Sequence, residues 1–354
     1  MNQKISVWLD VIRFMAAMIV FIGHASNGHI SGGLFWQIYP YLQSAVIVFF
    51  VLSGYVIAHV TDEKNDSLAA YARDRFARIH SVLLPALMLT LICDSVGSSL
   101  NPEHYQKFQP IYQDHQLLRY GLSAFVMQNL WNADLYPGTN GPMWSLTYEV
   151  SYYAMWASVV WARGAVRVAL LMGFALVSGP SVLSLFPVWL SGVAAYRMNR
   201  RMLRNGRQIP LARSLTVLLF LALMVVAPVV RAKWHVHLPY LRSELLGDYF
   251  DALVFSGILI LAPSMLSRLH LVDQQVRVVR YFAQATFAIY LFHYPLLRMF
   301  TVIHGGSAAS PGNWILLYPV SFVIMMLLVP LTERLQSLFK RWTGVPSRIP
   351  MRAP

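Results

Sequence analysis

Three ionisable residues lie in the first apolar stretch of the chain: Asp10, Arg13 and His24. Such groups are costly in apolar surroundings, so each needs either a partner or a function. Asp10 and Arg13 are three positions apart, a spacing that allows an ion pair on a helix. Arg13 and His24 are eleven positions apart, about 20° from three full turns, so a helix presents them on one face. The pattern predicts a chemically active helix face. Contact with lipid headgroups is the alternative for Arg13 and His24.

A second cluster of charge lies in residues 71–80, which contain Arg73, Arg75 and Arg78. On a helix, Arg75 and Arg78 are one turn apart and lie side by side. Guanidinium groups bind phosphate through paired hydrogen bonds, and they also bind anionic lipid headgroups. The segment therefore predicts a phosphate site or a contact with the membrane surface.

Aromatic and polar residues precede another apolar stretch, where the sequence reads Trp144-Ser145-Leu146-Thr147-Tyr148-Glu149. Aromatic rings stack on the apolar face of a sugar, and a carboxylate accepts hydrogen bonds from sugar hydroxyls. We expect Trp144, Ser145 and Tyr148 to contact substrate. Glu149 is predicted to bind substrate or handle a proton near the external mouth of its helix.

His293 stands two residues before Pro295, in the sequence Tyr290-Leu291-Phe292-His293-Tyr294-Pro295. It is predicted either to line the same polar space or to pack against a carbonyl that the proline leaves free. His235 and His237 alone are too weak a signal for a metal, so no metal site is predicted.

Composition defines the environment of these residues. The chain has 354 residues, 57% of them hydrophobic and 12% charged, whereas about a quarter of a soluble chain is charged. It is therefore predicted to be a polytopic membrane protein. The net charge of +13 is explained by basic cytoplasmic loops, so nucleic acid is not expected as a partner. The lone Cys93 excludes an intrachain disulfide.

Ten segments have roughly the 20 apolar residues that a membrane-spanning helix needs. Their cores are Val7–Gly28, Leu42–Val60, Ser81–Val96, Pro142–Trp161, Val166–Val182, Leu185–Tyr196, Leu215–Val230, Tyr249–Met265, Phe282–Ile303 and Asn313–Leu331. With both termini in the cytoplasm, 21 Lys and Arg fall in cytoplasmic segments and 5 in external ones. The expected fold is an all-α transmembrane bundle of about ten spans. The long external connection before Gly141 is predicted to face substrate.

These motifs, in this order, resemble the acyltransferase-3 family of integral membrane acyltransferases. The resemblance rests on the sequences Leu9-Asp10-x-x-Arg13 followed by His24, Phe49-Phe50-Val51-Leu52-Ser53-Gly54-Tyr55, Arg75-Phe76-Ala77-Arg78-Ile79, Trp144 to Glu149, and Ile289 to Pro295. It departs at His80-Ser81, where the family often has an aromatic residue and proline. Residues 1–354 are expected to form a single domain without the C-terminal extracytoplasmic hydrolase-like domain of some members.

The resemblance implies transfer of an acyl group, usually acetyl, from cytoplasmic acyl-coenzyme A to hydroxyls of cell-surface carbohydrate. Arg75 and Arg78, with Arg73 as an auxiliary, would hold coenzyme A phosphates. Arg13 would face the thioester arm, His24 would act at the reaction centre and Glu149 would orient the acceptor. Asp10 and His293 are also expected to contact substrate. Acyl-coenzyme A, most simply acetyl-coenzyme A, would be a co-substrate, with no tightly bound cofactor.

Neutral imidazole suits His24 to act as general base on the acceptor hydroxyl, and a transient acyl-imidazole is an open alternative. The expected location is the inner (plasma) membrane, with polysaccharide-synthesis machinery as a partner. The same buried charges would also suit a transporter or flippase of a lipid-linked sugar, although the sequence has no evident internal repeat. A purely structural subunit is disfavoured because Arg13, His24 and Glu149 are all present.

Overall fold

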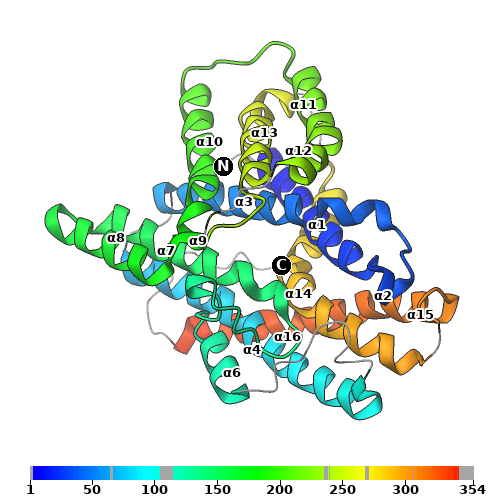
Figure 1. Ribbon diagram of the computed structural model, residues 1–354. Helices are drawn as coiled ribbons and strands as arrows, with labels where there is room; N and C mark the ends of the chain where they lie inside the picture. Colours follow the sequence, from blue (N-terminus) through cyan, green and yellow to red (C-terminus); the bar gives the residue numbers. More distant parts are fainter. Residues whose placement is uncertain are drawn as a thin grey trace.

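The computed structural model describes residues 3–63, 67–103, 115–234, 238, 240–267, 271–305 and 307–342. These residues form helices and no strand (Figure 1), which confirms the all-α fold class. His235 and His237 lie outside them. The elements are α1 (Gln3–Ala25), α2 (Gly28–Ser31), η1 (Trp36–Tyr41), α3 (Leu42–Glu63), α4 (Leu68–Leu100), α6 (Gln116–Ala124), η2 (Leu130–Asn132), η3 (Gly141–Met143), α7 (Trp144–Trp161), α8 (Gly164–Ser178), α9 (Pro180–Ser184), α10 (Phe186–Arg204), α11 (Ala212–Leu221), η4 (Ala222–Val226), α12 (Ala227–Lys233), α13 (Leu245–Met265), α14 (Asp273–His304), α15 (Pro311–Ile315), η5 (Leu316–Val320) and α16 (Ser321–Trp342).

Each of the ten predicted segments is helical. In chain order they correspond to α1, α3, α4, α7, α8, α10, α11 with α12, α13, α14, and α15 with α16. Seven helices in the described part of the chain are long and apolar enough to cross a membrane, or eight if the pair α8 and α9–α10, bent by 114°, counts as one. The chain is thus a multi-pass membrane protein by composition and fold, whereas the count of ten spans and the side of each terminus stay predictions.

Several helices are longer than their apolar cores. α4 begins at Leu68, where the Ser67 side chain accepts a hydrogen bond from the Ala70 backbone N–H at 3.2 Å, and it therefore includes the arginine segment. α10 continues to Arg204 and α14 begins at Asp273. Backbone hydrogen bonds continue where side chains become polar, so hydropathy marks only the apolar part of each helix.

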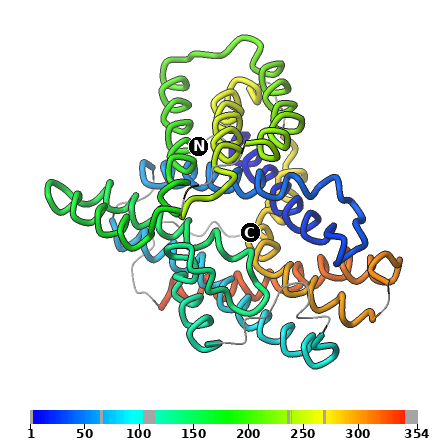
Figure 2. Tube along the Cα trace, in the orientation of Figure 1, coloured from blue at the N-terminus to red at the C-terminus, as the bar shows by residue number. Residues whose placement is uncertain are grey.

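α14 and α3 are the most buried of the seven apolar helices. α1 packs against both of them, α4 and α16 pack on α14, and α10 packs along α3. α10, α11, α12 and α13 form a second group around α13, which stands at the top of the view in Figure 2. The motif-bearing helices α1, α3, α4 and α14 therefore lie side by side around a common space.

α3 and α10 approach closely at two glycines. A Cβ added to Gly54 would lie 2.0 Å from the backbone oxygen of Trp189, and one added to Gly192 would lie 1.9 Å from that of Val51. Each contact is too short for any side chain, so the absence of a Cβ sets the distance between the two helices. Gly54 and Gly192 thus allow the two backbones to approach one another closely.

Three prolines in helices leave carbonyls free, and a polar side chain from another element donates a hydrogen bond to each of these carbonyls. Pro295 of α14 cannot donate to the carbonyl of Leu291, which accepts a hydrogen bond from Asn140 Nδ2 at 3.0 Å instead. Likewise, Tyr41 Oη donates to the Met224 carbonyl, four residues before Pro228, at 2.6 Å, and Asn199 Nδ2 donates to the Leu259 carbonyl, four residues before Pro263, at 2.8 Å. Each proline thereby ties its helix to a neighbouring element.

Candidate active site between two cavities

A cavity of about 400 Å³ opens among α1, α3, α4, α7, α14 and α16. Its charged lining residues are Asp10, Arg13, Arg75, Arg78, Glu149, Arg280 and Glu333. We refer to it as the arginine cavity. It combines four guanidinium groups with three carboxylates, which favours an anionic ligand that also carries polar groups able to hydrogen-bond to carboxylate.

Arg75 and Arg78 project into the arginine cavity from the same side of α4, as their spacing predicts. The guanidinium carbon of Arg75 lies 5.9 Å from the ring centroids of both Tyr71 and Tyr153. Its buried Nε has no hydrogen-bond partner among the described residues, so it can donate to a ligand. Arg73 does not line this cavity; it bonds Asp74 at 3.0 Å.

Arg13 lies in the arginine cavity and pairs with Asp10 at 3.7 Å, confirming the predicted ion pair on α1. Eleven residues further along α1, His24 lines a different cavity. Arg13 and His24, on one face of α1, therefore line two different cavities.

Glu149 also lines the arginine cavity, whereas the sequence placed it near the external mouth with the acceptor. It accepts hydrogen bonds from Ser53 Oγ at 2.9 Å and from Tyr153 Oη. α7 begins at Trp144, and five residues of helix rise about 7.5 Å, enough to carry the carboxylate from one cavity to the other. This position does not support the prediction that Glu149 orients the acceptor substrate.

The second cavity, of about 790 Å³, has a lining rich in aromatic and hydrogen-bonding side chains. These are His24, Asn27, Tyr39, Gln43, Tyr136, Trp144, Arg231, Arg242, Glu244, Tyr290 and Tyr294. We call it the histidine cavity. Tyr136 belongs to the long connection that the sequence predicts to face substrate, and Gly141 and Pro142 directly follow it. Partial burial, with the nearby Asp134 carboxylate, raises the pKa of Tyr136 above its usual range, so its hydroxyl stays protonated.

Trp144, Ser145 and Tyr148, all predicted substrate contacts, lie in three different places. Trp144 lines the histidine cavity, with the Arg242 guanidinium 4.3 Å from its ring centroid. Ser145 lines the arginine cavity, and its Oγ lies 2.7 Å from Tyr290 Oη. Tyr148 lies on neither wall; it is fully buried and stacks on Phe50 at a centroid distance of 6.2 Å. Tyr148 is therefore a core residue, because its position on α7 turns it toward α3.

His293 lies directly behind His24. Its Nε2 is 3.1 Å from His24 Nδ1, and its Nδ1 is 3.0 Å from the Ile289 carbonyl. Of the two predicted roles, lining the space or binding the carbonyl freed by Pro295, neither is adopted: the ring is fully buried and lines neither cavity, and Asn140 occupies the freed Leu291 carbonyl.

The two cavities have two lining residues in common, Val46 of α3 and Tyr290 of α14. Tyr290 Oη donates to the Pro142 carbonyl at 3.0 Å and also bonds Ser145, which fixes its ring at the boundary. Phe49 packs against that ring at a centroid distance of 5.7 Å. The wall between the cavities is therefore only a few side chains thick.

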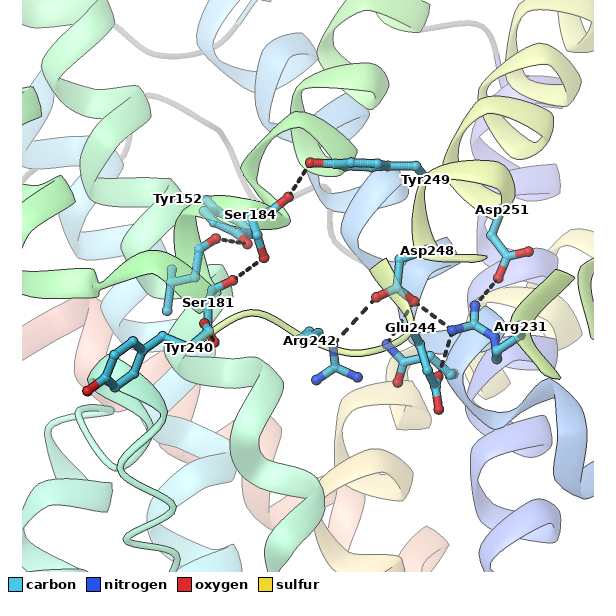
Figure 3. Close-up of polar contacts among 12 residues, drawn as sticks. Tyr152, Ser181, Ser184, Arg231, Tyr240, Arg242, Glu244, Asp248, Tyr249 and Asp251 are labelled. Carbon is cyan, nitrogen blue, oxygen red and sulfur yellow. Dashed lines mark hydrogen bonds and ion pairs between the residues drawn. The ribbon is translucent and has the colours of Figure 1, made fainter. Parts of the chain in front are cut away.

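Sequence reasoning missed an ionic cluster at the rim of the histidine cavity. Arg231 of α12 bonds Glu244 at 2.8 Å, Asp248 at 2.7 Å and Asp251 at 2.5 Å, and Arg242 lies 3.4 Å from Asp248 (Figure 3). Asp248 and Asp251 are fully buried. The available signal was the cost of two aspartates near the start of an apolar helix, which demands a cationic partner. The cluster ties α12 to α13 and holds Arg242 beside Trp144.

The sequence motifs therefore line two neighbouring cavities in a helical membrane bundle. One cavity is lined by arginines, the other contains His24, and a thin wall separates them. Residues 6–334 match the acyltransferase-3 family, described as an acyltransferase domain, and the chain belongs to that family. It is also similar to an O-acetyl transferase of Shigella phage Sf6, with 31% identity over 156 residues. That match covers 41% of this chain and 43% of the phage protein, less than half of either. No solved structure matches the chain.

Proposed function

We propose that the protein is a membrane O-acetyltransferase, moving acetyl from cytoplasmic acetyl-coenzyme A to a hydroxyl of a cell-surface or exported carbohydrate. The observation that carries the proposal is the meeting of the arginine cavity and the histidine cavity at Val46 and Tyr290. Acyl transfer across a membrane needs an anionic donor and a hydroxyl acceptor to meet at one point without an open channel. Family membership favours this function over transport of a lipid-linked sugar.

The arginine cavity is the proposed donor site. Coenzyme A carries several phosphates, and Arg75 and Arg78 offer adjacent guanidinium groups on one helix face. Arg13 lies deeper along α1, toward His24, where it would meet the arm that carries the thioester. Glu149 and Asp10 would then face the donor, and the Glu149 carboxylate is suited to accept hydrogen bonds from pantetheine amides.

The histidine cavity is the proposed acceptor site. Sugars present apolar ring faces and many hydroxyls, and this cavity offers Trp144, Tyr39 and Tyr294 for stacking with Asn27 and Gln43 for hydrogen bonds. The name of the phage relative supports acetyl as the group transferred. On this proposal the protein lies in the inner (plasma) membrane beside polysaccharide-synthesis machinery, and acetyl-coenzyme A is a co-substrate rather than a bound cofactor.

His24 is the proposed general base. Its imidazole takes the proton of the acceptor hydroxyl as the oxygen attacks the thioester carbonyl carbon, forming a C–O bond. The tetrahedral intermediate then breaks its C–S bond, and the imidazolium returns the proton to the departing coenzyme A sulfur. Acyl transfer through His24 itself uses the same groups in two steps.

The test compares cells that carry the wild-type gene, no gene, or the His24→Gln variant. Mass spectrometry of their envelope glycans should show one added acetyl per modified sugar in the wild type alone. Binding of acetyl-coenzyme A to the purified proteins, measured by titration calorimetry, should be equal for the wild type and His24→Gln. Identical glycans in all three strains, or a wild type that does not bind acetyl-coenzyme A, would overturn the proposal.

A further inference from the structure

The hydrogen-bond partners of His293 define its tautomer. Its Nδ1 lies 3.0 Å from the Ile289 carbonyl, which can only accept, so Nδ1 carries the ring hydrogen. In the neutral ring, Nε2 then has a lone pair and can only accept. That lone pair lies 3.1 Å from His24 Nδ1.

The hydrogen-bond partners of His24 likewise define which of its ring nitrogens carries the hydrogen. Its Nδ1 lies 3.0 Å from the Val20 carbonyl and 3.1 Å from His293 Nε2, and both of these atoms are acceptors. His24 Nδ1 must therefore carry the hydrogen, shared between the two. The remaining nitrogen of His24, Nε2, is left with its lone pair. His24 lines the histidine cavity, while His293 is fully buried behind it.

We propose that His293 is a positioning residue that holds His24 in the Nδ1–H tautomer, so that Nε2 is the basic atom in the histidine cavity. This inference rests on the proposed function. When His24 Nε2 takes the acceptor proton, the positive charge spreads to Nδ1–H, and the bond to His293 Nε2 stabilises it. The proton then leaves from His24 Nε2 to the coenzyme A sulfur. His293 neither gains nor loses a proton in either step.

The Val20 carbonyl, at 3.0 Å, is the second acceptor of the His24 Nδ1–H. It lies four residues before His24 on α1, so it also accepts the backbone hydrogen bond of the helix. His293 Nε2 comes from another helix and has no other acceptor role among the described residues. The pair also has supporting packing, since Tyr294 contacts the His24 ring at a centroid distance of 5.2 Å and Phe21 contacts His293 at 6.4 Å.

Two variants test whether His293 acts as a hydrogen-bond acceptor or only fills space. His293→Gln can place an amide oxygen near the position of Nε2, whereas His293→Leu fills the space and accepts nothing. In metal sites, the partner that orients a ligating histidine is worth about 10- to 100-fold, and we take the same range for His24. We expect His293→Leu to lower kcat for transfer from acetyl-coenzyme A to envelope glycan by that range, with KM for acetyl-coenzyme A unchanged. His293→Gln should recover most of kcat.

Nitrogen-15 NMR of protein labelled at the histidine rings gives a second readout that needs no activity. The signals of His24, identified by their loss in His24→Gln, should show a protonated Nδ1 and an unprotonated Nε2 in the wild type and in His293→Gln. His293→Leu should shift the population toward Nε2–H.

The outcomes are distinguishable. A wild-type His24 in the Nε2–H tautomer overturns the inference even if transfer is intact, and it can be measured if His293→Leu fails to fold. Equal kcat in His293→Leu and wild type also overturns it. The assigned tautomer in a protein that transfers no acetyl supports the placement of His293 and overturns the proposed function instead.

Discussion

At the residue scale, the candidate site has an arginine and a histidine set apart along a single helix. Arg13 and His24 share a face of α1, and their spacing corresponds to a rise of about 16 Å. That length places one residue in each cavity. Moving either residue by one position would turn its side chain by about 100°, away from that face. The spacing therefore matters as much as the residue types.

The removal of His24 should affect the chemical step and not donor binding. We expect His24→Gln to lower the transfer rate by about 10² to 10⁴, the usual contribution of a general base, because glutamine keeps hydrogen-bonding groups but cannot take a proton. Release of coenzyme A thiol by purified protein in the presence of envelope glycan measures this rate. His29→Gln, on the neighbouring helix α2 and outside both cavity linings, is the matched control. Near-normal turnover in His24→Gln would reduce His24 to a structural role.

The arginine cavity gives a second prediction. Arg75→Gln should weaken acetyl-coenzyme A binding by about 10- to 100-fold, since a hydrogen bond to a charged group contributes roughly 1.5 to 3 kcal/mol. Arg280→Gln should also weaken it, because Arg280 lines the same cavity from α14.

Arg277 provides the control for both arginines. It lies one turn from Arg280 on α14, is exposed and does not line the cavity. Titration calorimetry on the purified variants should leave Arg277→Gln with wild-type affinity. Equal affinity in Arg75→Gln, Arg280→Gln and wild type would show that acetyl-coenzyme A does not bind in this cavity.

The sequence predicted the residues whose position follows from spacing on one helix. Arg13, Arg75 and Arg78 lie where they were expected, and His24 faces the same space as the aromatic Trp144. Predictions failed where contacts between helices decide. Neither the placement of Glu149 beside the arginines nor the burial of Tyr148 against Phe50 follows from local pattern. Arg280 and the His24–His293 contact join positions far apart in the chain.

At the element scale, carbonyls that prolines free inside helices are paired with polar side chains from other elements. Pro295 frees the Leu291 carbonyl, and Asn140, in the turn before α7, donates to it. The same turn is fixed to α4, since Asp94 accepts hydrogen bonds from Thr139 N at 2.9 Å and from Thr139 Oγ1 at 2.7 Å. The start of α7, and with it Trp144, is thus held against α4 and α14. A sequence shows where the prolines are, but not which side chains occupy the carbonyls that they free.

The contact between α3 and α10 gives a prediction about stability. Gly54→Ala places a Cβ about 2.0 Å from the Trp189 carbonyl oxygen, and overpacking typically costs about 1 to 3 kcal/mol. Its thermal unfolding temperature in detergent should fall. Gly173→Ala on α8, where a new Cβ meets nothing within 4 Å, should be unchanged or gain about 0.5 to 1 kcal/mol, because alanine favours helix. If the two variants unfolded alike, the close approach of α3 and α10 would be wrong.

At the scale of the whole molecule, the helices form two spaces instead of one channel. α1, α3, α7 and α14 each contribute residues to both cavities, and the boundary is made by Val46 and Tyr290. On the proposed function, a wall this thin would let a thioester and a hydroxyl approach one another while side chains block the free passage of water. The sequence predicted the ten helical segments and their order, because apolar length is a local property. How those helices pack around two cavities depends on contacts that hydropathy does not encode.

The proposed function also requires one orientation of the whole molecule: because acetyl-coenzyme A is cytoplasmic, the arginine cavity would have to open to that side. In a Cys93→Ala background, a cysteine replacing exposed Ala72, next to the arginines of α4, should resist a membrane-impermeant maleimide added to intact cells and react after permeabilisation. A cysteine replacing exposed Ser307, in the connection between α14 and α15, should react in intact cells, since the charge distribution predicts that connection to be external. The paired sites matter because they control for access and expression. Labelling of Ala72→Cys in intact cells would show that the predicted orientation is wrong. The arginine cavity could then not bind a cytoplasmic donor, whatever the arginine variants show.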